Sequence, residues 1–339
     1  MTNQHYPNNQ PRITLHEFSA LKKAFLAFVK TLPATSPLSI KLTRAIYGKK
    51  LKHMRNAGPN LRLIPDQDGW QVYWKSKLLT TTVPFPQPTT SHKPLWIMAT
   101  GPSICDQDLA QLKNEIIIGL NGAIATCSEY GLSPTYYAIT DRDFFENRMH
   151  LVRDALQSGA HCFFSFEGIA RICQQAPNLL QNAKISLLET VNRYYMTSQL
   201  TDDQLRDQLR NNLTFDLPDY HTSKSGWSHN ASLGVFTGNT IAYIACQIAQ
   251  SLNFQTAHII GMDLGSTKGK VRSYESGNDA RPTSIDTDYD KYILPAFKLL
   301  AKQKLSTQFW NLSPTSRLPE SVMPRKPFDQ ALTDIDVLQ

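Results

Sequence analysis

From residue 95 onward, short apolar runs alternate with stretches of helical character, and each run ends at a polar residue. The runs are LWIMA at 95–99, EIIIGL at 115–120, TYYAIT at 135–140, CFFSF at 162–166, HIIGM at 258–262 and FWNL at 309–312. Strands bounded by helices form mostly parallel sheets with helices on both faces. Ligands of such sheets bind at the carboxyl ends of the strands. The pattern therefore predicts an α/β fold with its site at that edge.

The chain has 339 residues, which suits a main domain with an appendage. The Pro- and Thr-rich segment VPFPQPTTSHKP at 83–94 predicts a linker. We therefore expect an N-terminal extension at 1–90, a ligand-binding domain at 91–325 and a C-terminal tail at 326–339. Within the extension, residues 69–83 predict a short hairpin.

Positive charge is concentrated in the extension. Residues 1–90 hold 13 Lys and Arg against 3 Asp and Glu, whereas the remainder has a net charge of −3. Two basic amphipathic stretches, 15–30 and 40–55, could lie on an anionic membrane surface, or could pack on the main domain with their lysines in water. A membrane surface bound through residues 1–56 is one expected partner. Nucleic acid is not expected, because no helix-turn-helix, zinc or aromatic RNA-binding signature accompanies the charge.

Cysteine usage and hydropathy favour a cytoplasmic location. The five cysteines show no CxxC or metal-ligand spacing, which predicts free, structural thiols. No apolar run approaches the roughly 18 residues of a membrane span. The N-terminus begins MTNQHYP, without an apolar signal core.

Polar residues follow the first two apolar runs. Thr100-Gly101-Pro102-Ser103 predicts a tight turn into a helix, where glycine permits close backbone approach and the serine hydroxyl and free N–H groups can hold a phosphate or ribose. The second run ends at Asn121, where a dinucleotide-binding fold would carry an acidic residue. The complete GxGxxG fingerprint is also missing, so a dehydrogenase is disfavoured.

Asp141-Arg142-Asp143 follows the third run and has the spacing of a metal-binding DxD motif. The alternative is structural: Asp143 caps the next helix and Asp141 ends the strand. We favour the structural interpretation and expect no metal, although Asp141 can still contact a ligand.

Two later segments carry further candidates. Residues 232–253 predict a long buried helix, preceded by Thr237-Gly238-Asn239, a small polar segment suited to an anion. The loop at 261–275 carries the donors and charges Asp263, Lys268, Lys270, Arg272 and Tyr274. Loops with many donors after a buried strand are often functional. A third segment, YHTSKSGWSHN at 220–230, is either a surface loop or a lid with His221 and His229.

In their order and spacing these motifs resemble the bacterial CMP-sialic acid transferases. More closely, they resemble the lipopolysaccharide inner-core transferases that add a third 3-deoxy-D-manno-octulosonic acid (Kdo). The matching residues are Gly101-Pro102-Ser103, the Asn121-Gly122 pair, Thr140-Asp141, Thr237-Gly238, Thr240 to Leu252, Gly261-Met262-Asp263, Tyr274, Ile293 to Phe297 and Asn311 to Ser316. The resemblance covers residues 95–320, and residues 1–90 fall outside it.

The resemblance implies a Rossmann-like fold and an inverting transferase that uses CMP-Kdo without a metal or other cofactor. By residue-wise correspondence, Gly101, Ser103 and Asn121 would contact the cytidine nucleotide, with Thr237 and Gly238 nearby. We also assign Thr100, Pro102, Asp141 and Asn239, which lie beside these residues or at the end of the third run, to the expected donor site. Tyr274, with Arg272, would stabilise the departing phosphate. The sialyltransferases place a general-base histidine shortly before the last helix, whereas this chain has Ser284 to Asp290 there. Asp288 or Asp263 is then the candidate base.

The resemblance also implies a lipid-anchored glycan acceptor and a peripheral position on the inner face of the inner membrane. Two other functions stay open on the sequence. One is a sialyltransferase or another transferase of CMP-linked nonulosonic sugars. The other is a non-catalytic nucleotide- or lipid-binding protein, which loss of the polar site residues would favour.

Overall fold

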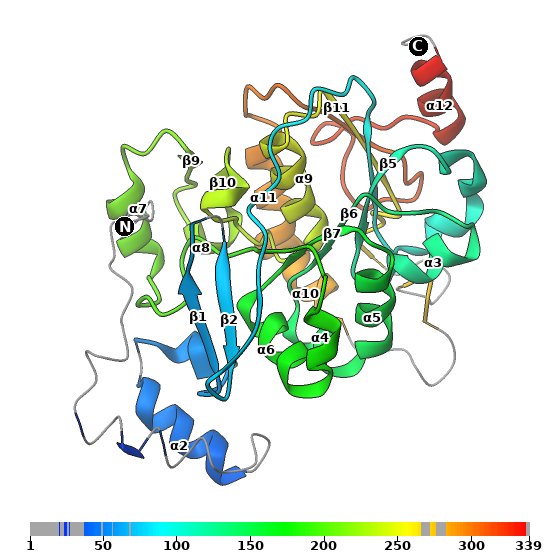
Figure 1. Cartoon of the computed structure of the whole chain (residues 1–339). Coiled ribbons are helices and arrows are strands. Elements are labelled where there is room, and N and C mark those ends of the chain that lie inside the picture. Colours follow the sequence, from blue (N-terminus) through cyan, green and yellow to red (C-terminus); the bar gives the residue numbers. More distant parts are fainter. Residues whose placement is uncertain are drawn as a thin grey trace.

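A seven-stranded, wholly parallel sheet forms the centre of the molecule (Figure 1). The computed structural model describes residues 37–48, 50–55, 57–67, 69–265, 272–275 and 283–336, together with positions 20, 24, 25 and 27. The strand order is β12-β11-β4-β5-β6-β7-β8. The strands are β4 (Leu95–Met98), β5 (Ile116–Leu120), β6 (Tyr136–Ile139), β7 (His161–Phe164), β8 (Ile185–Leu187), β11 (Thr256–Ile260) and β12 (Gln308–Asn311). The predicted α/β class is therefore confirmed.

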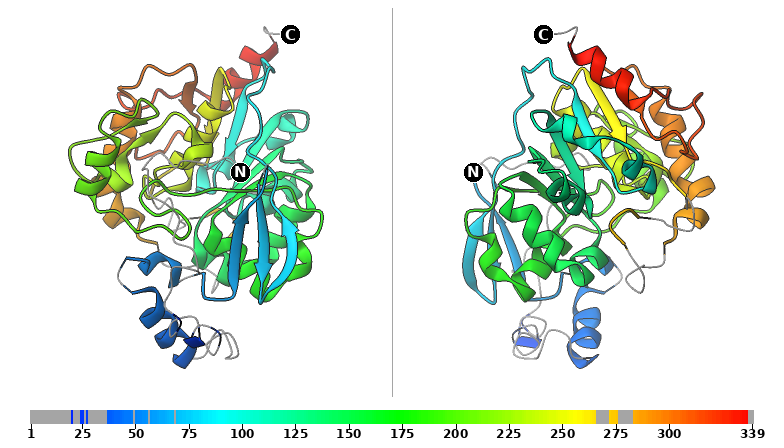
Figure 2. Two further views of the ribbon diagram at one scale, coloured as in Figure 1. Left: turned by 60° about the vertical axis from the view of Figure 1, so that its left-hand side comes forward. Right: turned by 90° about the vertical axis from the view of Figure 1, so that its right-hand side faces the viewer.

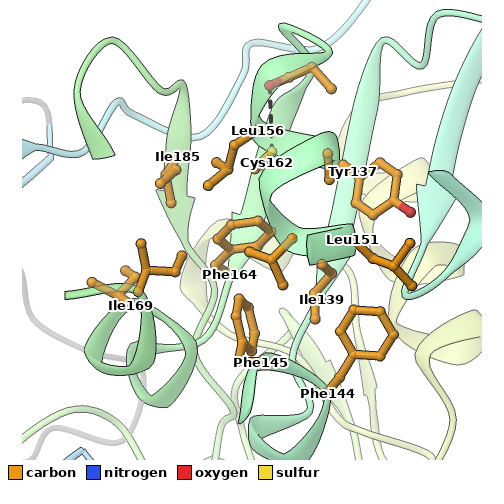
Figure 3. Packing of buried hydrophobic residues seen from close by; sticks show 14 of the residues in the cluster. Tyr137, Ile139, Phe144, Phe145, Leu151, Leu156, Cys162, Phe164, Ile169 and Ile185 are labelled. Atoms are coloured by element: carbon orange, nitrogen blue, oxygen red, sulfur yellow. Dashed lines mark hydrogen bonds between the residues drawn. The ribbon is translucent and has the colours of Figure 1, made fainter. Parts of the chain in front are cut away.

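The strands are mostly apolar because both faces of the sheet are buried. Alternate side chains enter two separate cores, so that Trp96 and Met98 of β4 face one and Leu95 and Ile97 face the other. Figure 3 shows the first core around Phe164, where the Phe145 ring meets it edge to face at 5.1 Å between centroids.

Helices cover each core (Figures 1 and 2). The first lies beneath α3 (Ala123–Glu129), α4 (Arg142–Asn147), α5 (Met149–Gln157), α6 (Phe166–Gln175) and α12 (Phe328–Asp336). The second lies beneath α7 (Asp202–Leu209), α9 (Ile241–Ser251) and α11 (Leu294–Leu300). The shorter helices α8 (Thr222–Ser225) and α10 (Ile285–Asp288) lie in connections on this second side, with the two-residue strands β9 (Phe215–Asp216) and β10 (Trp227–Ser228).

Two predicted helices differ from the observed ones. After β4 the chain forms two 3₁₀ helices, η3 (Pro102–Asp106) and η4 (Leu109–Leu112), in place of an α-helix. The helix predicted at 232–253 begins only at Ile241. Gly238 and Asn239 have φ values of +51° and +52°, and left-handed residues cannot continue a right-handed helix. The preceding part contains the 3₁₀ helix η6 (Ala231–Leu233) and a loop.

The described part of the N-terminal extension packs against the main domain. It contains α2 (Pro37–Tyr47), the 3₁₀ helix η2 (Lys52–Arg55) and an antiparallel sheet of β1 (Leu61–Pro65), β2 (Trp70–Trp74) and β3 (Lys77–Thr81). The sheet contains the expected hairpin plus β1, which was not predicted. Ile46, Leu51 and Met54 belong to the first core, whereas Lys41, Lys50 and Lys52 are exposed. For residues 46–54 the packing interpretation of the basic stretch therefore holds.

The Pro- and Thr-rich segment at 83–94 contains no helix or strand, but it is fixed to the main domain. Its Val83 N–H donates to the Ile185 carbonyl at 2.9 Å and its Thr89 N–H to the Leu252 carbonyl at 2.8 Å. No helix among the described residues is long and apolar enough to cross a membrane. All five cysteines are free, and only Cys105 is exposed.

Candidate active site

The turn after β4 is bound to the turn after β11 through a buried carboxylate. Asp263 is 2% exposed, and its Oδ2 accepts the Ser103 N–H at 2.8 Å. The Gly101 N–H donates to the Gly261 carbonyl at 2.7 Å. A Cβ added at Gly101 would lie 2.5 Å from both Asp263 Oδ2 and the Gly261 carbonyl oxygen. The glycine is therefore required for the contact between the two turns.

Three buried side-chain oxygens at this edge lack a hydrogen-bond partner among the described residues. They are Ser103 Oγ, Asn121 Oδ1 and Ser273 Oγ. Asn121 is held with φ at +48°, and its carbonyl accepts the Tyr137 hydroxyl at 2.7 Å. Buried polar atoms are usually paired, and ligands of parallel sheets bind at the carboxyl ends of the strands, so these oxygens are candidate ligand contacts.

Tyr274 is held over the second turn. The preceding Ser273 N–H donates to the Thr100 carbonyl at 2.7 Å. The Tyr274 ring lies so close to Gly122 that a Cβ there would be 2.2 Å from its nearest carbon. Burial raises the Tyr274 pKa to about 12, against a smaller opposing effect of Arg272. The phenol therefore stays protonated at neutral pH and can donate a hydrogen bond.

A buried ion-pair group supports this loop. Arg272 Nη1 donates to both carboxylate oxygens of Glu275, at 3.0 and 3.1 Å. Arg148, at the junction of α4 and α5, approaches the same carboxylate at 3.5 Å. Two guanidinium groups therefore lie beside the Glu275 carboxylate near Tyr274. The sequence prediction included Arg272 but missed Glu275 and Arg148, because nothing in their spacing signals the contact.

Asp141, and not Asp143, caps the helix that follows β6. Its side chain accepts the Asp143 N–H at 2.9 Å at the start of α4, while Asp143 pairs with Arg142. The predicted assignment of the cap to Asp143 is therefore wrong, because the capping residue must precede the first turn. Among the described residues, no group of three or more His, Cys, Asp and Glu could hold a metal ion.

The segment Thr237-Gly238-Asn239 leads into α9 at the same edge of the sheet. The Gly238 N–H donates to the Lys224 carbonyl at 2.8 Å, and Lys224 Nζ donates to Asn239 Oδ1 at 2.6 Å. A Cβ at Gly238 would meet the Tyr243 ring at 2.6 Å. Lys224 is a residue that the sequence did not single out.

Asp288 ends α10, is partly exposed, and accepts a hydrogen bond from the Ser284 hydroxyl. Its charge acts on Lys224, whose pKa is lowered mainly by burial.

In the candidate lid, His229 hydrogen-bonds the Asp216 carboxylate, and the centroid of the His221 ring lies 4.9 Å from that of the Tyr292 ring. Lys268 and Lys270 lie outside the described residues.

We predict that Asp263→Ala destabilises the protein through the turn after β4. The buried Ser103 N–H would lose its acceptor, which lowers the free energy of unfolding by about 1–3 kcal/mol. Urea unfolding measures the change. Asp154→Ala, which removes an exposed carboxylate from α5, is the control and should stay within about 0.5 kcal/mol of wild type. Equal effects of the two substitutions would contradict a structural role for Asp263.

Comparison with known proteins identifies the family of this chain. Residues 87–326 match the family described as 3-deoxy-D-manno-octulosonic acid transferase WaaZ. A probable 3-deoxy-manno-octulosonic acid transferase of Escherichia coli K12 is 25% identical over 245 residues, covering 67% of this chain and 80% of that protein. A protein of the same description from Salmonella typhimurium LT2 is 21% identical over 247 residues, covering 67% and 84%.

Two solved structures are similar at lower levels. The MAf glycosyltransferase of Magnetospirillum magneticum AMB-1 has a TM-score of 0.45 and 12% identity, covering 94% of this chain and 49% of that one. The sialyltransferase CstII of Campylobacter jejuni has a TM-score of 0.37 and 14% identity, covering 69% and 86%. The family match spans well over half of the chain and includes every described candidate site residue. The chain therefore belongs to the WaaZ-type Kdo transferase family and is a glycosyltransferase with a role in lipopolysaccharide core synthesis.

Proposed function

We propose that this chain transfers Kdo from CMP-Kdo to a sugar hydroxyl of the lipopolysaccharide inner core, with inversion at the anomeric carbon and without a metal. The observation that carries the proposal is the set of unpaired buried oxygens at Ser103 and Asn121, with Tyr274 held beside them. A serine hydroxyl and an asparagine amide can bind the hydroxyl and amine groups of a cytidine nucleotide. Family membership supports Kdo as the sugar.

The leaving group is a phosphate that gains negative charge as the glycosidic bond breaks. The bond between the anomeric carbon and the phosphate oxygen breaks with its electrons going to CMP, while the acceptor oxygen forms the new bond from the opposite face. A neutral Tyr274 hydroxyl can donate to that phosphate, and the charge of the neighbouring Arg272 guanidinium acts at the same place.

The acceptor hydroxyl must lose a proton as it attacks. The Asp288 carboxylate accepts a hydrogen bond from the Ser284 hydroxyl and is partly exposed. An accessible carboxylate can take up that proton. Asp263 is a poorer candidate because its buried carboxylate already accepts the Ser103 N–H. We therefore assign the base role to Asp288 and a positioning role to Asp263. We also propose that Asp141, Thr237 and Gly238, at the same edge of the sheet, contact the nucleotide.

The experiment that tests the function compares donors. Purified chain is incubated with CMP-Kdo or CMP-sialic acid, an inner-core acceptor and excess EDTA, and CMP release is measured. We expect acceptor-dependent release from CMP-Kdo that EDTA leaves unchanged. Preference for CMP-sialic acid would assign another CMP-linked nonulosonic sugar. Activity lost in EDTA and restored by magnesium or manganese would contradict the metal-free mechanism.

Tyr274→Phe tests the leaving-group role. Loss of a donor that strengthens in the transition state should lower kcat roughly ten- to a thousandfold, with little change in donor KM. Gly122→Ala should act in the same direction, because its methyl group would occupy the position of the Tyr274 ring.

The control for both variants is Tyr130→Phe, which removes a hydroxyl at the end of α3 and should leave both constants within about twofold of wild type. Since burial raises the Tyr274 pKa to about 12, the wild-type pH profile should show no tyrosine ionisation at neutral or mildly alkaline pH. If the Tyr274→Phe enzyme kept the wild-type kcat, other hydrogen-bond donors would have to stabilise the leaving phosphate.

We also propose that the N-terminal basic segment binds the anionic membrane surface that carries the acceptor. Ile46, Leu51 and Met54 belong to the core, so the truncation should end before them. Deletion of residues 1–36 removes Arg12, Lys22, Lys23 and Lys30, each contributing about 1 kcal/mol near such a surface. Sedimentation with anionic liposomes should therefore weaken while CMP-Kdo hydrolysis persists. Unchanged sedimentation would contradict this role.

A further inference from the structure

Two half-buried cations lie together at the carboxyl edge of the sheet without an ion-pair partner. Arg193 Nε donates to Thr190 Oγ1 at 3.1 Å, and Lys224 Nζ donates to Asn239 Oδ1 at 2.6 Å. Among the described residues, no carboxylate oxygen lies within 4.0 Å of either charged group. Half-buried charges without a counter-ion are costly, which indicates that an anion completes the site.

The two charges act on one another. The Lys224 pKa is lowered first by burial and then by the Arg193 charge. Several acidic groups lie nearby. Asp288 raises the Lys224 pKa, and Arg193 opposes the burial that raises the pKa of Glu167. The buried Glu189 carboxylate accepts the Tyr195 N–H, and Asp202 accepts the Ser223 N–H at 3.0 Å. None of these four carboxylates comes within ion-pair distance of Arg193 or Lys224.

Backbone pairing brings the two residues together from distant parts of the chain. After β8, the Val191 N–H donates to the Val235 carbonyl at 3.1 Å, and the Val235 N–H donates to the Glu189 carbonyl at 2.9 Å. This pairing places Arg193 beside the segment that leads to Asn239. The bond from Gly238 to the Lys224 carbonyl adds α8 to the same place.

The cation pair extends from the β8 side of the sheet edge toward the proposed donor segment. Arg193 follows β8, which lies three strands from β5 in the sheet order. Lys224 is hydrogen-bonded to Asn239, which leads into α9, and α9 packs against β4 and β5. Asp288, the proposed base, acts electrostatically on Lys224. A sugar bound at Lys224 could therefore present a hydroxyl to Asp288 while the nucleotide occupies the β4–β5 side.

The N-terminal extension docks beside Arg193. His53 Nε2 hydrogen-bonds the Tyr194 carbonyl at 2.9 Å, and the Gln199 N–H donates to the Lys50 carbonyl at 2.9 Å. The basic part of the chain therefore approaches the cation pair directly. An acceptor rich in negative charge would meet both on the same side of the protein.

We propose that Arg193 and Lys224 bind an anionic group, a carboxylate or a phosphate, of the acceptor sugar. The guanidinium group can bind either anion with two parallel hydrogen bonds, and the ammonium group adds a point charge. This inference rests on the proposed transferase function and adds to it the acceptor-binding residues.

The test uses Arg193→Gln and Lys224→Gln in the full chain, with Arg210→Gln as the matched control. Arg210 is exposed at the end of α7, and within the part of the chain that the structure describes its one ion-pair partner is Asp207. Each test variant should raise the acceptor KM tenfold or more, because hydrogen bonds to charged groups contribute about 1.5–3 kcal/mol. For Arg193→Gln, donor KM and acceptor-free CMP release should stay within about twofold of wild type. Lys224→Gln also removes the hydrogen bond to Asn239 in the proposed donor segment, so this variant is compared in acceptor binding only. Arg193→Lys should recover part of the loss.

Dephosphorylated acceptor separates the two anions. If the two cations bind a phosphate, removing it should raise the acceptor KM of wild type to that of the variants. If they bind a carboxylate, the difference in acceptor KM between wild type and variants should persist. Calorimetric titration of the acceptor without donor gives the same comparison independently of catalysis. It therefore stays decisive if wild type fails to use CMP-Kdo, a result that would contradict the proposed function alone. A raised donor KM of Arg193→Gln, or no change in acceptor binding by either variant, would overturn the inference, with melting curves confirming that the variants are folded.

Discussion

The site depends on the hydrogen bond that the buried Asp263 carboxylate accepts. The carboxylate lies after β11 and accepts the N–H of Ser103, which lies after β4, so that two neighbouring strands end in one fixed structure. Gly101 permits this contact because a side chain there would collide with the carboxylate. The Ser273 N–H then attaches the Tyr274 loop to the Thr100 carbonyl. The proposed donor site is thus a set of turns held by hydrogen bonds to one another, with Ser103 and Asn121 oxygens left for a ligand.

Around this centre the chain distributes charge along the edge of the sheet. Arg148 and Arg272 lie beside Glu275 near Tyr274, where the proposed phosphate departs. Arg193, which follows β8, and Lys224, which is bonded to Asn239 before α9, add two further cations, and the N-terminal extension docks beside Arg193. Positive side chains on both sides offset the repulsion between two anionic substrates that approach one reaction centre. The proposed base, Asp288, acts electrostatically on Lys224.

The parallel sheet could be predicted from sequence because its strands are apolar on both faces and end in polar turns. The positions of Ser103, Asn121 and Asp263 followed from those ends. β8 was not predicted because it has only three residues. The helix predicted at 232–253 was too long because two left-handed residues, Gly238 and Asn239, interrupt the apolar stretch. Glu275, Arg148, Arg193 and Lys224 were missed because their roles arise from contacts between segments distant in sequence. Backbone pairing and ion pairs of that kind leave no local pattern.

The most direct measurement of the central claim is hydrogen exchange with and without CMP. If the nucleotide binds the unpaired oxygens at the β4 and β5 turns, amides in residues 99–104 and 119–124 should be protected by CMP. Residues 237–240 should show the same effect, while the hairpin at 70–81 should stay unchanged. The matched experiment on Asp263→Ala should show weaker protection at 99–104, because the turn would lose its anchor. CMP-dependent protection confined to other segments, or protection absent at saturating CMP, would contradict the placement of the donor site.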